Sequence, residues 1–355
     1  MPATDTATRQ PAVSVIIPAR NEEACLGACL ESLVMQAGVA FEIIVVNDHS
    51  TDRTREIASS FSSSPHQSEV LVISPGPLPT GWSGKNNAVI AGSRTARGDW
   101  LLFTDADTIH LPGSLMRSIA EAQRHGAAML SYSPEQIVKS FCEKAVMPVI
   151  FAELAATFRP SQVSDPNSPA AAANGQYILI TREAYDAVGG HASIAGHLLE
   201  DVALARAVKR SGRKIFFRFG GDAVRTRMYR TFAQLREGWT KNLALLFPSP
   251  LRLAALRAIE FVLILASFAI ALAAALRGHR RPALVACILG LTLYTFLLAR
   301  IRRAHFSWDA NLLAVFGLPL FSYLLLHSAR AHAKGSVLWK GRNYSEKSAV
   351  LATGH

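Results

Sequence analysis

Short apolar runs recur at regular intervals over the first hundred residues. They are five or six residues long and comprise the β-branched run Val13–Pro18, followed by Phe41–Val46, Val70–Ser74 and Trp100–Thr104. Runs of this length and composition predict buried strands. Between the strands we expect helices, one capped by Asn21 and running to about Met35, another beginning over Thr54–Ser60. Strands alternating with helices predict an α/β fold, with a mostly parallel sheet covered by helices on both faces.

Three of the expected strands end in polar clusters. These clusters are Ala19–Glu22, Asn47–Asp52 and Asp105–Asp107. In open parallel sheets, ligands bind at the carboxyl ends of the strands. We therefore expect a binding site along that edge.

Longer apolar runs follow after residue 250. They are Ala258–Leu276, Ala283–Ala299 and the shorter Leu312–Leu326, and three Arg residues lie in each of the two connections between them. The first two approach the roughly 17–25 residues that a membrane-spanning helix needs, and the third is marginal unless its flanks join it. We expect a polar tail over 1–11, a catalytic domain over 12–250, a membrane region of two or three transmembrane helices over 251–330, and a basic tail over 331–355.

The charge distribution argues against a nucleic-acid-binding protein. The formal net charge is +11, but residues 1–250 hold 24 Lys and Arg against 23 Asp and Glu, whereas residues 251–355 hold 13 against 3. Basic residues placed between apolar runs are typical of membrane proteins. The four cysteines are too few and too scattered for a disulfide framework, and the first 12 residues contain no apolar segment of a signal peptide. We expect the catalytic domain in the cytoplasm.

Two stretches allow alternative interpretations. Phe141–Phe158 is apolar but contains three charged residues, which predicts an amphipathic helix that either faces the core or lies in the membrane interface. Residues 206–241 hold 11 Lys and Arg against two acids. This basic stretch is either a solvated face, a contact for anionic head groups, or a partner for a diphosphate.

Acidic pairs are the strongest candidates for chemistry. Asp105 and Asp107 flank one small residue at the end of an expected strand, where both can reach Mg²⁺ or Mn²⁺. Glu200 and Asp201 precede an amphipathic run, so they either complement a helix dipole or provide a general base. Lys85, within the loop Gly81–Asn87, could meet a phosphate or a carboxylate.

Six motifs in order resemble glycosyltransferase family 2. They are VSVIIPARNEE, VVNDHSTD, GWSGKNNA, FTDADT, NGQYILITREAYDAVGGH and LEDVALARAV, over about residues 12–245. The resemblance implies a GT-A fold, a nucleotide-diphosphate sugar, a divalent metal and inversion of the anomeric centre. The apolar tail, GWSGKNNA and Trp339–Tyr344 resemble a narrower group that includes ceramide glucosyltransferase-like, hopanoid-associated and carotenoid glycosyltransferases, whose acceptors are lipids.

The resemblance also implies roles for individual residues. It places Pro18, Arg20 and Glu22 on the nucleotide, Asp48 on the uracil or ribose, Lys85 near the donor, and Asp105 and Asp107 on the diphosphate and its metal. It makes Asp201 the base and Glu200 the group that orients it.

Two positions depart from the family pattern. Asn47 replaces the first of two acids that many relatives have before the Ser-Thr-Asp triplet. Leu235–Trp239 keeps only the Trp of the motif found in processive members, so Trp239 either contacts a sugar or packs at an interface.

We therefore expect an inverting glycosyltransferase in the inner (plasma) membrane, transferring a hexose, most simply from a UDP-sugar, to a lipid hydroxyl. The alternatives are a polyprenyl-phosphate glycosyltransferase or polysaccharide synthase, and a catalytically inactive membrane scaffold. Three crossings would place Trp339–Tyr344 on the opposite side of the membrane from the active site, and the equal Arg content of the two connections does not decide the topology.

Overall fold

The computed structural model describes residues 11–63 and 68–344, and the chain divides into two compact units. The first, the sheet unit, extends to Glu135 and resumes over Phe158–Arg227. The second, the helical unit, comprises Gln136–Thr157 and, within the described residues, the chain from Met228 to Tyr344. The compact units therefore do not follow chain order, because Gln136–Thr157 groups with the C-terminal helices.

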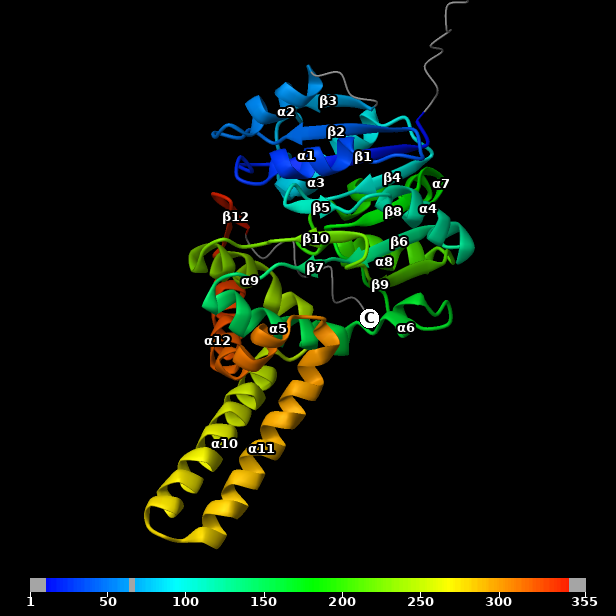
Figure 1. Ribbon diagram of the computed structural model, residues 1–355. Coiled ribbons are helices and arrows are strands. Elements are labelled where there is room, and N and C mark those ends of the chain that lie inside the picture. The colour runs from blue at the N-terminus through cyan, green and yellow to red at the C-terminus, as the bar shows by residue number, and fades with distance from the viewer. Residues whose placement is uncertain (1–10, 64–67, 345–355) are drawn as a thin grey trace, which may run out of the picture. The chain divides into compact units, whose positions relative to one another are not determined.

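A seven-stranded sheet forms the centre of the sheet unit (Figure 1). In spatial order its strands are β3 (Glu69–Ile73), β2 (Phe41–Asn47), β1 (Val13–Ala19), β4 (Trp100–Phe103), β8 (Ile178–Thr181), β6 (Met129–Ser133) and β9 (Ile215–Phe219). Strand β8 runs antiparallel to β4 and β6, and the other neighbouring pairs are parallel. The predicted mostly parallel sheet is confirmed.

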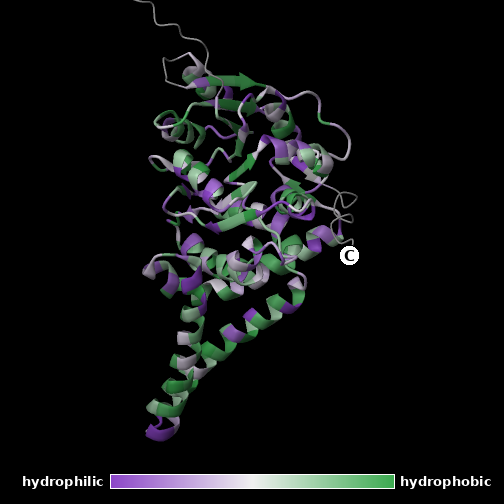
Figure 2. Cartoon of the chain, turned by 90° about the vertical axis from the view of Figure 1, so that its right-hand side faces the viewer, coloured by the Kyte–Doolittle hydropathy of each residue, from purple (hydrophilic) through white to green (hydrophobic). Residues whose placement is uncertain are grey.

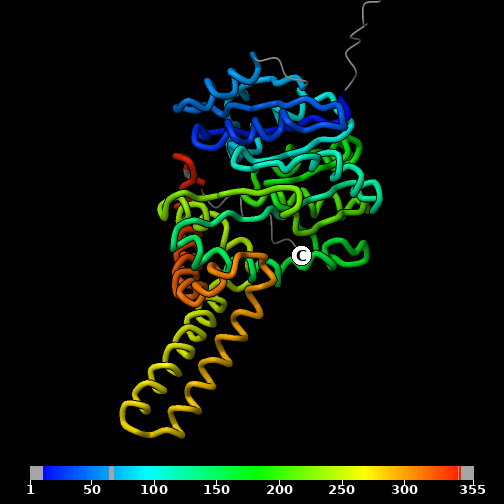
Figure 3. The backbone as a smooth tube through the Cα atoms, in the orientation of Figure 1, coloured from blue at the N-terminus to red at the C-terminus, as the bar shows by residue number. Residues whose placement is uncertain are grey.

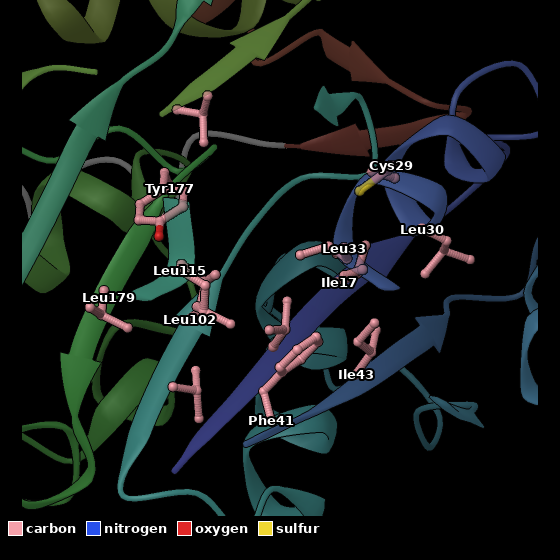
Figure 4. Packing of buried hydrophobic residues seen from close by; sticks show 14 of the residues in the cluster. Ile17, Cys29, Leu30, Leu33, Phe41, Ile43, Leu102, Leu115, Tyr177 and Leu179 are labelled. Atoms are coloured by element: carbon pink, nitrogen blue, oxygen red, sulfur yellow. The ribbon is translucent and has the colours of Figure 1, made fainter. Parts of the chain in front are cut away.

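Helices cover both faces of this sheet, as the apolar strands require. Side chains alternate between the faces of a strand: in β1, Val15 and Ile17 join one buried cluster and Ile16 joins another. Figure 4 shows Ile17 in the first cluster, together with Cys29. Residues of α1 (Leu26–Val34), α2 (Thr54–Ser62) and α4 (Ser114–Arg124) complete that cluster, and residues of α3 (Gly84–Thr95) and α8 (Glu200–Arg210) belong to the second.

Shorter elements complete the sheet unit. A small sheet has the strand order β5 (Thr108–His110), β10 (Val224–Thr226) and β7 (Glu135–Gln136). The remaining helices are α6 (Pro160–Ser164), α7 (Arg182–Ala187) and the 3₁₀ turn η1 (Gly190–Ile194).

The first helix begins later than the sequence predicts. We expected Asn21 to cap it, but Asn21 has a φ of 53° and α1 begins at Leu26. The intervening peptide groups bond instead to side chains at the end of the next loop and the start of α2: Glu22 N donates to Thr54 Oγ1 at 2.7 Å, and Glu23 N donates to Asp52 Oδ2 at 3.1 Å. These bonds tie the loops after β1 and β2 together.

Close packing fixes helix α3 against the sheet. A Cβ placed on Gly92 would lie 2.5 Å from Ile16 Cγ2 in β1, so only glycine allows this approach. Because α3 is held this closely, the position of its N-terminus relative to the strand ends is set by packing.

The helical unit contains the long apolar helices. Its elements are α5 (Phe141–Thr157), α9 (Phe232–Leu246), α10 (Pro250–Leu276), α11 (Arg280–Ile301), the 3₁₀ turn η2 (Arg302–Ala304), α12 (Trp308–Ala333), β11 (Val337–Trp339) and β12 (Arg342–Tyr344). By length and composition, three helices of the described chain could cross a membrane: Pro250–Leu276, Arg280–Ala304 and Trp308–Ala333. The residues on both sides of the predicted apolar run Leu312–Leu326 belong to the same helix, since α12 has 26 residues. Figure 3 shows α10 and α11 as an antiparallel pair joined by a turn.

The predicted amphipathic helix faces the interior of the helical unit. Val146, Met147 and Ile150 of α5 are buried.

Trp239 of α9 lies in the same buried cluster as these α5 residues, with 2% exposure; its Nε1 approaches Met147 Sδ at 3.4 Å and its ring packs on Phe151. Of the two roles considered for Trp239, the structure shows packing.

Candidate active site

Helix α3 places a lysine between two acids that are distant in sequence. Ser83 caps the helix by accepting a hydrogen bond from Asn86 N at 3.1 Å. In the first turn, Lys85 Nζ lies 2.7 Å from Asp105 Oδ1 and 2.8 Å from Glu200 Oε1. Burial alone would lower the pKa of Lys85, but the two carboxylates outweigh it and raise that pKa well above its ordinary value. Lys85 is therefore a fixed cation.

The turn that contains both aspartates is held from several sides. Asp105 and Asp107 lie between β4 and β5, and β5 pairs with β10. Thr226 Oγ1 in β10 donates to Asp107 O at 3.1 Å and accepts from Gln176 Nε2 at 3.1 Å. Thr104 Oγ1 donates to Gln176 O at 2.8 Å. These bonds order the turn before any ligand binds.

The two aspartates fit a hard divalent cation. Within the described ranges, no group of three or more His, Cys, Asp or Glu residues could hold a metal. Mg²⁺ and similar ions commonly bind through one or two carboxylates and complete their shell with water and substrate phosphates. The ammonium at 2.7 Å shows that Asp105 already binds a positive charge. Asp105 and Asp107 could thus hold Mg²⁺ or Mn²⁺ once a diphosphate supplies the remaining oxygens.

Asp201 is held by two peptide N–H groups. It lies in the first turn of α8, where its Oδ2 accepts from Gly175 N at 3.0 Å and its Oδ1 accepts from Val202 N at 2.8 Å. Burial and the neighbouring charge of Glu200 raise its pKa to about 6. A carboxylate with this pKa is mostly ionised at neutral pH yet accepts a proton far more readily than an ordinary Asp.

The contacts of Glu200 add a role that the sequence does not predict. The resemblance implies that Glu200 orients Asp201, whereas the structure shows it in an ion pair with Lys85 while two peptide N–H groups hold Asp201. Glu200 acts on Asp201 through its charge.

A glycine at the centre of this cluster is missing from the sequence-based assignment. A Cβ on Gly175 would lie 3.1 Å from Lys85 Nζ, 3.5 Å from Glu200 Oε1 and 3.6 Å from Asp201 Oδ2. The peptide of Gly175 reaches Asp201 because no side chain intervenes. The Asn-Gly pair ahead of the apolar run Ile178–Ile180 was the available signal.

Asn86 is a second residue without a predicted role. Its Nδ2 donates to Ala195 O at 2.9 Å and to Ile194 O at 3.2 Å, which ties the start of α3 to η1.

His191 in η1 is buried and contacts the Tyr185 hydroxyl at 3.1 Å, and burial lowers the pKa of His191 to about 4. His191 is therefore neutral at physiological pH.

The residues expected on the nucleotide come together at the ends of β1 and β2. Pro18 pairs in register with Val46, and Arg20 Nη1 donates to Asp48 O at 2.8 Å. Asp48 is 4% exposed, and Glu22 follows in the loop already described. Because β1 lies between β2 and β4, these residues lie at the same edge of the sheet as Asp105, which follows β4.

Several basic residues of the 206–241 stretch have structural partners. Arg218 pairs with Glu121 and Asp222, Arg225 with Glu135, and Arg213 with Glu183. These three arginines stabilise the sheet unit, which accounts for part of the positive charge in this stretch.

Comparisons with known proteins agree on the type of domain. Residues 14–187 match the sequence model of the family described as Glycosyl transferase family 2. Over 241 residues the chain is 32% identical to 4,4'-diaponeurosporenoate glycosyltransferase of Staphylococcus aureus (strain USA300), covering 66% of this chain and 61% of that protein. The chain thus spans about three fifths of the length of the curated relatives it matches.

One solved structure of a glycosyltransferase has a similar fold. Mannosyltransferase PcManGT from Pyrobaculum calidifontis, in complex with GDP-Man and Mn²⁺, has a TM-score of 0.53 and 16% identity, with 91% of this chain and 87% of that chain covered. Glucosyl-3-phosphoglycerate synthase from Mycobacterium tuberculosis, in complex with Mn²⁺ and uridine-diphosphate-glucose, has a TM-score of 0.41 and 19% identity, with 66% and 78% covered. The similarity to PcManGT confirms the predicted fold class.

Proposed function

We propose that this chain, whose residues 14–187 match the model of glycosyl transferase family 2, is an inverting glycosyltransferase that moves a hexose from a nucleotide-diphosphate sugar to a hydroxyl of a membrane lipid. The observation that carries the proposal is the cluster of Lys85, Asp105, Glu200 and Asp201. The ammonium of Lys85, its two carboxylate partners and the carboxylate of Asp201 lie close together, which supports a diphosphate site beside a general base.

Donor binding would use the edge formed by β1, β2 and β4. Pro18, Arg20, Glu22 and Asp48 would hold the nucleoside. A UDP-sugar is our first choice of donor. The PcManGT structure contains GDP-Man, so the donor panel must include guanosine diphosphate sugars.

In the reaction, Asp201 would remove the proton of the acceptor hydroxyl. The acceptor oxygen then bonds to the anomeric carbon from the face opposite the departing diphosphate, the bond from that carbon to the phosphate oxygen breaks, and the configuration inverts. A divalent cation on Asp105 and Asp107 would stabilise the negative charge of the leaving diphosphate when bound. Lys85 lies beside Asp105 and adds a second positive charge at the same place.

A lipid acceptor is supported by two observations. The named relative is a glycosyltransferase for diaponeurosporenoate, a carotenoid acid, and the helical unit of this chain contains three helices apolar enough for a bilayer. We place the enzyme in the inner membrane, with its sheet unit in the cytoplasm, where nucleotide sugars are available.

The test is Asp201→Asn, with Asp99→Asn as a matched control. Asp99 is exposed, and its substitution makes the same chemical change outside the site. We expect Asp201→Asn to lower turnover by about 10²–10⁴-fold, the usual contribution of a positioned base, while nucleotide-sugar affinity measured by calorimetry stays unchanged.

The same variant separates the alternative acceptors. A polyprenyl phosphate or the carboxylate of a lipid acid is already ionised and needs no base, so retained turnover in Asp201→Asn would contradict our proposal of a hydroxyl acceptor and favour an ionised acceptor. Product length measured by mass spectrometry would identify a polysaccharide synthase. Absence of nucleotide-sugar binding in folded wild-type protein would favour an inactive scaffold.

A further inference from the structure

The three apolar helices differ in how much of their surface the protein itself covers. Inside the apolar window of each helix, 11% of the residues of α10 and 17% of those of α11 are buried, against 50% for α12. A helix that faces lipid keeps its apolar side chains exposed in the absence of a bilayer. By this criterion α12 belongs to the interior of the helical unit, whereas α10 and α11 do not.

The first half of α12 packs directly on α5. A Cβ on Gly317 would lie 1.9 Å from Ala145 O, so the two backbones are in contact there. One end of this interface is held by an ion pair between Lys144 Nζ and Asp309 Oδ2 at 2.6 Å. Helix α5 has 17 residues and contains Glu143, Lys144 and Glu153, which makes it too polar to cross a bilayer.

The second half of α12 is bonded to α9. Ser328 accepts from Ala244 N at 2.9 Å and donates to Thr240 O at 2.6 Å. One turn later, His332 Nε2 contacts Lys241 O at 2.9 Å. Helix α9 has 15 residues and carries Arg236, Glu237 and Lys241. To cross a membrane, α12 would have to bring both charged partners into the hydrocarbon.

A balanced group of four charges lies at the base of α10 and α11. Arg257 Nη1 and Arg300 Nη2 bind Glu260 Oε2 at 2.7 and 2.8 Å. The same arginines approach Glu153 Oε1 of α5 at 2.9 and 3.6 Å. We call Glu153, Arg257, Glu260 and Arg300 the base cluster. It joins both apolar helices to α5, and a group of four charges is costly inside hydrocarbon.

Beyond the base cluster, α10 and α11 present apolar side chains outward. Large exposed residues there include Val262, Ile270, Leu272, Val285 and Phe296. Figure 2 shows this pair mainly in the colour of hydrophobic residues, with hydrophilic residues at the turn that joins the helices. Arg277 in the turn, together with Arg280 and Arg281 at the start of α11, suits lipid phosphates.

We propose that the α10–α11 pair alone crosses the bilayer, and that α12 remains on the side from which α10 departs. From Phe261 to Leu276, α10 rises about 24 Å, which is slightly less than the roughly 30 Å of a hydrocarbon core. Local thinning of the bilayer, and the long arginine side chains between α10 and α11, accommodate the difference. Two crossings return the chain to its starting side. The segment Val337–Tyr344 therefore lies on the same side of the membrane as the sheet unit.

This inference rests on the membrane anchoring in the proposed function and not on its chemistry. The experiment uses the whole chain with Cys25, Cys142 and Cys287 replaced by alanine; Cys29 is kept, because it is 0% exposed and closed to the reagent. Single cysteines are then introduced at two exposed positions, His279→Cys in the turn and Lys334→Cys after α12. Membrane retention after an alkaline wash and glycosyl transfer by the same preparation are measured separately.

We expect a membrane-impermeant maleimide to label His279→Cys in intact spheroplasts, and Lys334→Cys only after permeabilisation. Labelling of Lys334→Cys from outside would establish three crossings and overturn the inference. Absence of labelling at both positions in intact cells would show that the pair does not cross, which also overturns it. Loss of glycosyl transfer with the expected labelling would contradict the proposed chemistry while supporting the topology.

Discussion

The pH dependence of turnover offers a sensitive test of the assignment of Asp201. Its pKa of about 6 means that turnover should fall as the pH drops through 6, because the protonated carboxyl cannot accept the acceptor proton. At pH 5 about a tenth of the base is ionised, so turnover should fall about tenfold. An aspartate with an ordinary pKa would remain active at that pH.

Two variants should move this acidic limb in opposite directions. The charge of Lys85 lowers the pKa of Asp201 and that of Glu200 raises it. Lys85→Met should therefore shift the midpoint to higher pH, and Glu200→Gln should shift it to lower pH.

The structure sets the size of these shifts. Lys85 Nζ and Asp201 Oδ2 both lie within 3.6 Å of one point, the Cβ position at Gly175, so they are no more than about 7 Å apart. At an effective dielectric constant of about 20, a unit charge at that distance contributes about 2 kcal/mol. Since Lys85 is partly exposed to water, we expect a shift of about one pH unit.

The assay is turnover at saturating donor between pH 4.5 and 9, so that weaker donor binding does not distort the profile. Arg94→Gln is the matched control, because it removes an exposed cation from the last turn of the same helix. Its midpoint should coincide with that of the wild type. Midpoints that move in the same direction in Lys85→Met and Glu200→Gln, or that do not move, would refute the role of Asp201.

Three further substitutions test other parts of the structure. Gly175→Ala should lower turnover about tenfold with an unchanged melting temperature, since its Cβ would displace Lys85 Nζ; unchanged turnover would show that the position of Lys85 is not critical. Asp105→Asn should weaken Mn²⁺-dependent nucleotide-sugar binding at least about tenfold in calorimetry, whereas equal affinity would exclude Asp105 from the metal site. Gly317→Ala should lower the melting temperature in detergent by about 5 °C, equivalent to about 2 kcal/mol, because the added Cβ separates α12 from α5. The control Gly76→Ala should leave the melting temperature unchanged, because its Cβ meets nothing within 4 Å. Equal melting temperatures for Gly317→Ala and the wild type would contradict this packing.

The local elements could be predicted well from the sequence. The apolar runs at Val13, Phe41, Val70 and Trp100 correspond within one residue to the strands observed, because short apolar segments bounded by polar residues leave few alternatives. The antiparallel direction of β8 could not be predicted, since Ile178–Thr181 would be equally apolar in a parallel strand. The start of α1 was wrong because side chains of the next loop bind the peptide groups that a helix would use.

The chemistry of the site depends on contacts between distant residues. The acidic motifs are visible in the sequence, but the ion pair of Lys85 with Glu200 joins residues 115 positions apart. The role of Gly175 is defined by the space that it leaves, which no single-sequence pattern encodes. Likewise, the apolar composition of α12 resembles that of α10, and only packing distinguishes them.

The central claim is transfer of a sugar to a lipid hydroxyl. It is tested most directly by incubating purified, detergent-solubilised protein with UDP-glucose, UDP-galactose, UDP-N-acetylglucosamine or GDP-mannose, with Mn²⁺ or Mg²⁺, in the presence and absence of total membrane lipid. We expect lipid to stimulate nucleotide diphosphate release from one donor, and a glycolipid with inverted anomeric configuration to form. Folded protein that binds a donor but transfers its sugar to no lipid would contradict the account.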